Sequence, residues 1–246
     1  MIAKDALRKI VPRRWRRLYR KYVSPIVKDQ HYYEYIARRE FFRKAFAALS
    51  FNGIDGDYAE FGCCGGNTIG LAYKYSRKHK VFCKLWAFDS FSGLPPRSLP
   101  EDEHPVWIQG TMVIEEKEFR KICREKNIRD SDVIIVPGYY EQTLKPGTEV
   151  PLLNVCLAYI DCDMYSSARA VLEFLIPRLK HGMIIAFDDY YCWSASQVSG
   201  ERKACADYFK DNKDWALVPF ITFDGALGMS FIVESRNLNG TSESCY

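Results

Sequence analysis

The apolar run Val155–Ile160 constrains the fold more than any other stretch of this chain. Its sequence, Val-Cys-Leu-Ala-Tyr-Ile, has neither helical nor alternating periodicity, which is typical of a β-strand buried on both faces. Such a strand needs helices above and below its sheet, and parallel βαβ units are the common way to supply them. The run therefore predicts an α/β fold built on a parallel sheet.

Acidic residues follow this run where the strand would end, in Asp161-Cys162-Asp163. Ligands bind beyond the carboxyl ends of strands in open parallel sheets, so acids at this point are placed for a site. Two carboxylates this close repel each other, and an oxygen-liganded divalent cation between them relieves the repulsion. The alternative is structural, with both acids capping a helix that begins near Ser166.

Short apolar runs and amphipathic segments alternate from Asp57 onward, which predicts consecutive parallel βαβ units. The predicted strands are Asp57–Phe61, Leu85–Phe88, Val133–Val136, Val155–Ile160 and Met183–Phe187. The predicted helices are Asn67–Lys78, Glu115–Lys126, Ser166–Lys180 and Gly200–Asp211. Two closely linked runs then predict an antiparallel pair that completes a seven-stranded sheet, Trp215–Phe220 and Met229–Val233.

Residues 1–28 are basic and partly amphipathic, whereas the rest of the chain is slightly acidic within a net charge of +4. Such a segment suits an anionic lipid surface or a partner chain, as in a homo-oligomer, and a loosely packed arm is the alternative. One helix is predicted over Asp29–Leu49. We therefore divide the chain into an arm with its helix (residues 1–50), a main domain (51–236) and a polar tail (237–246).

Composition narrows the class of protein further. A hydrophobic content of 48% over 246 residues fits a globular domain, and the modest net charge disfavours nucleic-acid binding. No apolar run reaches the roughly 20 residues of a membrane-spanning helix, and the chain start lacks the apolar core of a secretory signal. We expect a cytoplasmic protein, with peripheral membrane contact through the basic segment as an option. The nine cysteines include no Cys-x-x-Cys pair, so reduced thiols are expected.

A glycine-rich turn follows the first predicted strand, with Gly62, Gly65 and Gly66 ahead of the helix that starts at Asn67. Glycines at such a turn let a ligand approach the backbone, and the helix start offers free N–H groups. The spacing is not the dinucleotide pattern G-x-G-x-x-G, and Glu60 beside the turn disfavours an anionic cofactor. A cationic or zwitterionic cofactor is therefore favoured, and a purely packing role for the glycines is the alternative.

Acidic residues follow two other predicted strands. Asp89 ends the second strand, where an acid accepts hydrogen bonds from ribose hydroxyls or else caps a turn. Asp188 and Asp189 end the fifth strand, beside the strand that leads to Asp161. Asp161, Asp188 and Asp189 are therefore predicted to hold a Mg²⁺-like ion that keeps open positions for substrate oxygens.

Six motifs in one order span about Tyr58 to Phe209: Glu60-Phe61-Gly62 with Gly65-Gly66, Phe88-Asp89-Ser90-Phe91-x-Gly93-Leu94-Pro95, Trp107-x-x-Gly110, Gly138-Tyr139-Tyr140-x-x-Thr143-Leu144, Asp161-x-Asp163-x-Tyr165-x-Ser167 and Asp188-Asp189-Tyr190. In these motifs the chain resembles the macrocin-type O-methyltransferases, S-adenosylmethionine-dependent enzymes that methylate sugar hydroxyls of natural products. The resemblance implies a class I methyltransferase fold, Rossmann-like, with a mostly parallel seven-stranded sheet, an antiparallel strand at its end and helices on both faces. The main domain would then be the methyltransferase domain.

The resemblance also implies a role for each part of the site. The cofactor's sulfonium would lie near Glu60 and Gly62, its ribose at Asp89 and its adenine near residues 138–140. The full cofactor set would be Glu60, Phe61, Gly62, Gly65, Asn67, Thr68, Asp89, Ser90, Phe91, Gly138, Tyr139, Tyr140 and Asp161. Mg²⁺ on the three acids would lower the pKa of an acceptor hydroxyl. The first candidate for the general base is an acid, Asp163, and the second is a histidine, His104; Asp161 completes the catalytic set.

Two other functions remain open from the residues alone. A metal-dependent glycosyltransferase with an Asp-x-Asp motif explains Asp161 and Asp163, but explains neither Glu60 nor the later acidic pair. A catalytically silent, membrane-associated binding module is the other, and the presence of all four acids argues against it. The acceptor is expected to be a sugar, a glycosylated natural product or a glycan, held on aromatic side chains drawn from Tyr32, Tyr33, Trp107, Tyr139, Tyr140, Tyr191 and Trp193.

Overall fold

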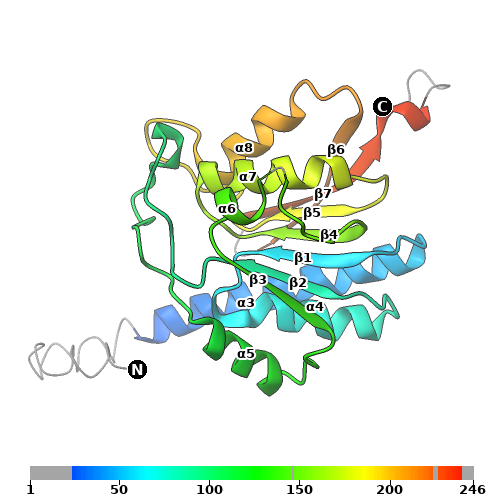
Figure 1. The fold of residues 1–246 in the computed structure, drawn as a ribbon, viewed down its shortest axis with the longest axis horizontal. Helices are drawn as coiled ribbons and strands as arrows, with labels where there is room; N and C mark the ends of the chain where they lie inside the picture. The colour runs from blue at the N-terminus through cyan, green and yellow to red at the C-terminus, as the bar shows by residue number, and fades with distance from the viewer. Residues whose placement is uncertain (1–23, 146, 224–226, 240–246) are drawn as a thin grey trace, which may run out of the picture.

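The computed structural model describes residues 24–145, 147–223 and 227–239. Its centre is a seven-stranded sheet in the order β3-β2-β1-β4-β5-β7-β6 (Figure 1). The parallel strands are β1 (Asp57–Phe61), β2 (Leu85–Asp89), β3 (Val133–Pro137), β4 (Val155–Ile160) and β5 (Ile184–Phe187). The strand β7 (Gly228–Ser235) runs antiparallel to both of its neighbours, β5 and β6 (Trp215–Phe223). The predicted mostly parallel sheet with an antiparallel end is confirmed.

Helices cover both faces of this sheet, as predicted (Figure 1). One face carries α3 (Ser24–Phe51), α4 (Asn67–Lys78) and α5 (Glu116–Glu125). The other carries α6 (Tyr140–Thr143), α7 (Tyr165–Leu175) and α8 (Gly200–Phe209). The helix α7 ends earlier than predicted and continues as the 3-10 turn Ile176–Arg178, because Pro177 has no N–H to extend the α-helical pattern.

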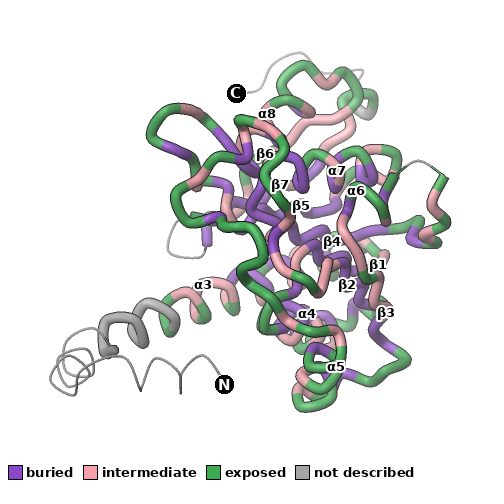
Figure 2. The backbone as a smooth tube through the Cα atoms, turned by 60° about the vertical axis from the view of Figure 1, so that its left-hand side comes forward, coloured by how far each residue is buried: buried purple, intermediate pink, exposed green. Residues whose placement is uncertain are grey.

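The two main core clusters lie on opposite faces of the sheet. Figure 2 shows that the buried residues concentrate in the central strands. All six residues of β4 are buried, as expected for a central parallel strand. Ala158 and Ile160 face the cluster under α7 and α8, while Leu157 and Tyr159 face the cluster under α3 and α4. The cysteines of the described residues are free and mostly buried, in line with reduced thiols.

The helix α3 packs directly on the sheet. Phe41, Phe42 and Phe46 are fully buried, and the Phe42 ring stacks on Tyr159 with a centroid distance of 5.3 Å. Arg38 of the same helix contacts Asp188, directly after the end of β5, so α3 reaches the carboxyl ends of the strands. Residues 1–23, most of the predicted basic segment, and residues 240–246 of the predicted tail lie outside the described residues, so the division of the chain stays a prediction there. Within the described ranges, no helix is long and apolar enough to cross a bilayer.

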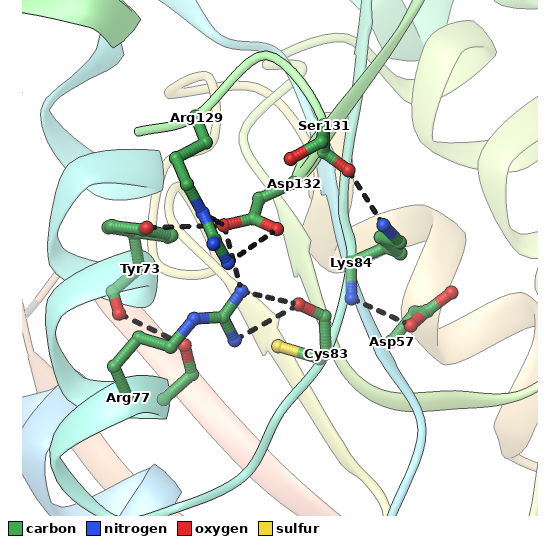
Figure 3. A network of polar contacts seen from close by, with 9 residues as sticks. Asp57, Tyr73, Arg77, Cys83, Lys84, Arg129, Ser131 and Asp132 are labelled. Atoms are coloured by element: carbon green, nitrogen blue, oxygen red, sulfur yellow. Dashed lines mark hydrogen bonds and ion pairs between the residues drawn. The ribbon is translucent and has the colours of Figure 1, made fainter. Parts of the chain in front are cut away.

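A polar network holds the opposite edge of the sheet, where the strands begin (Figure 3). The Asp132 carboxylate accepts a hydrogen bond from Arg129 Nε at 2.8 Å and one from the Tyr73 hydroxyl at 3.2 Å. Arg77 pairs with the same carboxylate at 3.4 Å and donates to the Cys83 carbonyl oxygen at 3.1 and 3.2 Å. The hydrogen bond from Arg129 is the largest of the effects that lower the pKa of Asp132. These contacts join α4 to the starts of β2 and β3 and leave the other edge free for a site.

Candidate functional site

A cavity opens at the carboxyl ends of the parallel strands. Its lining residues come from the turns after β1, β2 and β4, from the segment before α5 and from the beginnings of α6 and α7. The lining residues are Gly62, Cys64, Asp89, Ser90, Gly93, Leu94, Pro95, Met112, Tyr139, Tyr140, Asp161, Cys162, Asp163 and Ser167. Seven predicted site residues are therefore brought together here: Gly62, Asp89, Ser90, Tyr139, Tyr140, Asp161 and Asp163.

Gly62 permits a close approach of two strand ends. A Cβ atom on Gly62 would lie 1.7 Å from the carbonyl oxygen of Asp161, and its φ of +95° is unfavourable for other residues. The Gly62 N–H donates to the Phe88 carbonyl oxygen at 2.9 Å, which extends the sheet to this point. The missing side chain thus lets the turns after β1 and β4 meet, and Gly62 contributes only backbone atoms to the cavity lining.

Asp89 holds the glycine turn against the end of β2. One carboxylate oxygen accepts the Cys63 N–H at 2.7 Å, and the other accepts the Phe91 N–H at 2.7 Å. Burial raises the pKa of Asp89, and these two backbone N–H groups oppose that effect. Each carboxylate oxygen can accept a second hydrogen bond, so both remain available to ribose hydroxyls in the cavity. The geometry fits the ribose of a nucleoside cofactor.

Glu60 does not line the cavity. Its carboxylate is fully buried on the α3 and α4 side of the sheet, where it accepts a hydrogen bond from Thr68 Oγ1 at 2.7 Å and another from the Tyr58 hydroxyl. Burial raises the pKa of Glu60 to about 7. Through these hydrogen bonds, Glu60 connects the start of α4 to β1. The other predicted cofactor residues that are absent from the lining are Phe61, Gly65, Asn67, Thr68, Phe91 and Gly138.

An acidic cluster joins Asp161 and Asp163, which follow β4 and line the cavity, to Asp188 and Asp189, which follow β5 and are absent from the lining. Burial, and then repulsion by Asp188 and Asp189, raises the pKa of Asp161. Burial, and then Asp189, raises the pKa of Asp163. Burial, and then Asp188, raises the pKa of Asp189. The lining is therefore acidic, which fits a cofactor with a positive sulfonium.

Asp188 differs from the other three acids because a cation already pairs with it. Arg38 of α3 donates from Nε to Oδ1 at 3.1 Å and from Nη2 to Oδ2 at 2.6 Å. The Tyr159 hydroxyl also donates to Oδ1. In addition, the described residues contain no group of three or more His, Cys, Asp or Glu side chains that is placed to hold a metal ion. The predicted Mg²⁺ ligand set, Asp161 with Asp188 and Asp189, does not fit this arrangement as it stands.

His104, the second predicted base, is absent from the cavity lining. Its ring stacks on Trp107 with a centroid distance of 4.1 Å, and burial, followed by Arg97, lowers its pKa. Trp107 itself is buried, and burial and Asp189 raise the pKa of Asp163 by more than Trp107 lowers it. Of the predicted acceptor-binding aromatics, Tyr139 and Tyr140 line the cavity, whereas Trp107 packs behind Asp163. The rest are exposed side chains outside the cavity lining: Tyr32, Tyr33, Tyr191 and Trp193.

Three charged residues near the site were not predicted. Arg38 is an arginine within a largely apolar helical stripe, which was the available signal for a buried partner. Asp102 and Glu201 are both fully buried, and Asp102 accepts the Ser166 N–H at the start of α7 at 2.8 Å. An acid in the first turn of a helix ordinarily indicates only a favourable dipole interaction, so no local pattern distinguishes Glu201.

Comparison with known proteins identifies the family. A family model described as Macrocin-O-methyltransferase (TylF) matches residues 34–219, well over half of the chain. The chain belongs to this family. The predicted resemblance is thus confirmed, and the match includes the cavity, the acidic cluster and most of α3.

Two curated relatives from Streptomyces are similar to this member of the macrocin O-methyltransferase family. The 8-demethyl-8-(2,3-dimethoxy-alpha-L-rhamnosyl)-tetracenomycin-C 4'-O-methyltransferase of Streptomyces olivaceus is 29% identical over 165 residues, which cover 64% of this chain and 59% of the relative. The demethyldecarbamoylnovobiocin O-methyltransferase of Streptomyces niveus is 27% identical over 163 residues, which cover 63% of this chain and 60% of the relative. The matched region thus spans about three-fifths of each relative's length.

Solved structures share the fold. The O-methyltransferase NovP superposes with a TM-score of 0.67 at 24% identity and covers 82% of this chain and 81% of NovP. The calicheamicin methyltransferase CalS11 superposes with a TM-score of 0.60 at 20% identity, covering 79% and 77% of the two chains. The seven-stranded sheet with one antiparallel strand is therefore the class I O-methyltransferase fold.

Proposed function

We propose that this protein transfers the methyl group of S-adenosylmethionine to a hydroxyl group of a sugar, in a glycosylated natural product or a glycan. The observation that carries the proposal is the cavity that joins Gly62, Asp89, Asp161 and Asp163 at the carboxyl ends of β1, β2 and β4. Membership of the macrocin O-methyltransferase family supports the reaction class. The names of the two Streptomyces relatives, both O-methyltransferases of natural products, support the acceptor class.

The chain's own residues would place the cofactor along the cavity. Bound S-adenosylmethionine supplies an electrophilic methyl group on a sulfonium. Asp89 would accept hydrogen bonds from its ribose hydroxyls, and Tyr139 and Tyr140 would contact its adenine. The bare backbone at Gly62 and the carboxylate of Asp161 would face its positively charged end.

Asp163 is the group we assign as general base. It lines the same cavity as Asp161, on the turn that follows β4, so an acceptor hydroxyl beside the cofactor lies within its reach. The hydroxyl oxygen forms the new bond to the methyl carbon, the sulfur keeps the electron pair of the bond that breaks, and the hydroxyl proton passes to Asp163. The acceptor's sugar would lie against the cavity wall formed by residues 93–95 and Met112.

A divalent cation remains a prediction at this site. The acidic cluster has the charge for one, but Asp188 is available only if Arg38 leaves it. No step of the proposed reaction depends on the ion.

The proposal is tested by binding and by turnover. Calorimetry with S-adenosylhomocysteine should show binding, and calorimetry with a nucleoside diphosphate should show none; the reverse result would favour the Asp-x-Asp glycosyltransferase. Labelled S-adenosylmethionine should then transfer its methyl group to members of a panel of deoxysugar glycosides. Cofactor binding without transfer to any sugar would favour the silent binding module.

The membrane option concerns residues 1–28, of which residues 1–23 lie outside the described part. We propose that these basic residues strengthen contact with anionic lipid. Removing residues 1–23 should leave the fold intact, since the fully buried side chains begin at Phe41 within residues 32–51, the part of α3 whose burial is described. A smaller fraction of the truncated protein than of the full-length protein should sediment with phosphatidylserine vesicles, and this difference should be larger at low salt. Equal sedimentation of the two proteins would reject lipid contact.

A further inference from the structure

Asp163 occupies a strained turn. Its φ is +62°, and the Met164 N–H donates to the Cys162 carbonyl oxygen at 2.6 Å. A hydrogen bond between residues i+2 and i around a positive φ defines the rare form of γ-turn. A non-glycine residue keeps this conformation only when its surroundings hold it there, and such strain occurs preferentially at functional sites.

Glu201, in the first turn of α8, stabilises this conformation of Asp163. Its side chain is fully buried, and Oε1 accepts the Cys162 N–H at 2.9 Å and the Asp163 N–H at 3.3 Å. Its other oxygen, Oε2, accepts the Asp189 N–H at 3.1 Å. One carboxylate therefore bonds to the turns after β4 and β5 together, and these turns carry the acidic cluster.

A negative charge on Glu201 is unfavourable, because the side chain is buried close to other acids. A carboxylate at this position therefore needs an explanation. Burial, and then Asp189, raises its pKa, so a fifth acid adds to the repulsion among four others. Only a carboxylate has two oxygens that both accept and no hydrogen of its own. Three backbone N–H groups converge on this side chain, and a glutamine would oppose at least one of them with its own N–H. The three backbone N–H groups thus explain why a carboxylate occupies this position in spite of the electrostatic repulsion.

Close packing fixes the same turn from other directions. Gly200 has a φ of +57°, and a Cβ atom there would lie 2.7 Å from the Asp163 carbonyl oxygen and 2.4 Å from Trp107 Cη2. The Trp107 ring therefore packs directly against Gly200, which itself lies next to the Asp163 carbonyl oxygen. The Asp163 backbone is consequently confined by Glu201 at its N–H and by Gly200 at its carbonyl oxygen.

We propose that Glu201 is a positioning residue, which holds Asp163 in its positive-φ turn and fixes this turn against Asp189. Glu201 is not part of the cavity lining, so it acts through these two residues and not on the acceptor. The inference rests on the proposed function in one respect, the assignment of Asp163 as base.

The test compares Glu201→Gln with the exposed control Glu173→Gln of α7. Glu201→Gln should lower kcat by roughly 100-fold, the scale on which misplacement of a reacting group acts. Its acceptor KM and its affinity for S-adenosylhomocysteine should stay within about twofold of wild type, since the Asp89 and Gly62 contacts are untouched. Hydrogen exchange at residues 162–163 and 189 should rise, while exchange in β4 stays slow. The control should match wild type in all four measurements.

Two results would overturn the inference. One is a Glu201→Gln variant whose kcat stays within about threefold of wild type. The other is a parallel loss of kcat, cofactor affinity and thermal stability, which indicates a merely structural role. If Glu201→Gln does not fold, Glu201→Asp keeps the charge at shorter reach and is judged by the same criteria.

A double variant separates this inference from the proposed function. If Glu201 acts through Asp163, adding Glu201→Gln to Asp163→Asn should slow transfer no further. A further slowing by the full single-variant factor would show that Glu201 acts elsewhere. Hydrogen exchange is measured without a methyl acceptor. Unchanged exchange at residues 162–163 and 189 in Glu201→Gln would therefore count against the role of Glu201 alone. A wild-type protein that transfers no methyl group would instead count against the proposed function.

Discussion

Arg38 and Asp188 form a two-point ion pair between α3 and the end of β5, with Nη2 and Oδ2 separated by 2.6 Å. The residues are 150 positions apart in the sequence. The pair supplies a positive charge at the acidic cluster without any metal. It also makes the N-terminal helix part of the site.

The first prediction concerns this pair. Arg38→Met should lower the free energy of unfolding by about 2 kcal/mol, because the buried Asp188 carboxylate loses its cationic partner and keeps the Tyr159 hydroxyl as a donor. The same variant should bind Mn²⁺ roughly tenfold tighter than wild type, since Asp188 becomes available and the cluster gains a net negative charge. Urea unfolding and Mn²⁺ titration by electron paramagnetic resonance give the two values. Arg43→Met, which breaks an exposed pair with Glu40 on the same helix, is the control. Equal Mn²⁺ affinities in Arg38→Met and wild type would show that Arg38 and a cation do not share Asp188.

The second prediction concerns Asp89. Asp89→Ala removes the acceptor for the Cys63 and Phe91 N–H groups and for the ribose, so affinity for S-adenosylhomocysteine should fall by about 1.5–3 kcal/mol. Asp89→Asn keeps the shape and one acceptor oxygen, and its loss should be smaller. Calorimetry measures both affinities. Unchanged affinity in Asp89→Ala would remove Asp89 from the cofactor site.

Much of this architecture is predictable because it depends on local pattern. The run Val155–Ile160 has an apolar side chain at every position, so its burial on both faces follows from its composition alone. Asp89, Asp161 and Asp163 meet at one edge because the carboxyl ends of parallel strands lie together.

Other features depend on tertiary contacts that carry no local signal. Glu60 precedes the glycine turn, but both faces of a parallel strand are buried, so its sequence context does not reveal on which side the carboxylate lies. The Arg38–Asp188 pair and the contacts of Glu201 join segments far apart in the chain. No periodicity within either segment reports such a contact.

The third prediction concerns pH and Glu60. Its folded-state pKa of about 7 lies above its ordinary value of 4.5, so the folded state binds the proton more tightly than the unfolded state. Its contribution to stability is therefore greatest at low pH, is lost as pH rises from about 4.5 to 7, and stays lost above that.

Glu60→Gln tests this window. Relative to Glu60→Gln, wild type should lose about 2 kcal/mol of its free energy of unfolding when the pH rises from 5 to 8. Urea unfolding of both proteins at the two pH values measures it. A difference that is the same at pH 5 and pH 8 would show that Glu60 titrates normally.

The most direct test of the proposed reaction is methyl transfer by Asp163→Asn under single-turnover conditions. Wild type should move the labelled methyl group from S-adenosylmethionine to a sugar hydroxyl of a glycoside acceptor. Asp163→Asn should bind S-adenosylhomocysteine within about twofold of wild type and transfer the methyl group at least about 100-fold more slowly, because the hydroxyl proton has no acceptor. The exposed substitution Asp207→Asn should transfer at the wild-type rate. Transfer by Asp163→Asn at the wild-type rate would contradict the assignment of Asp163 as the base.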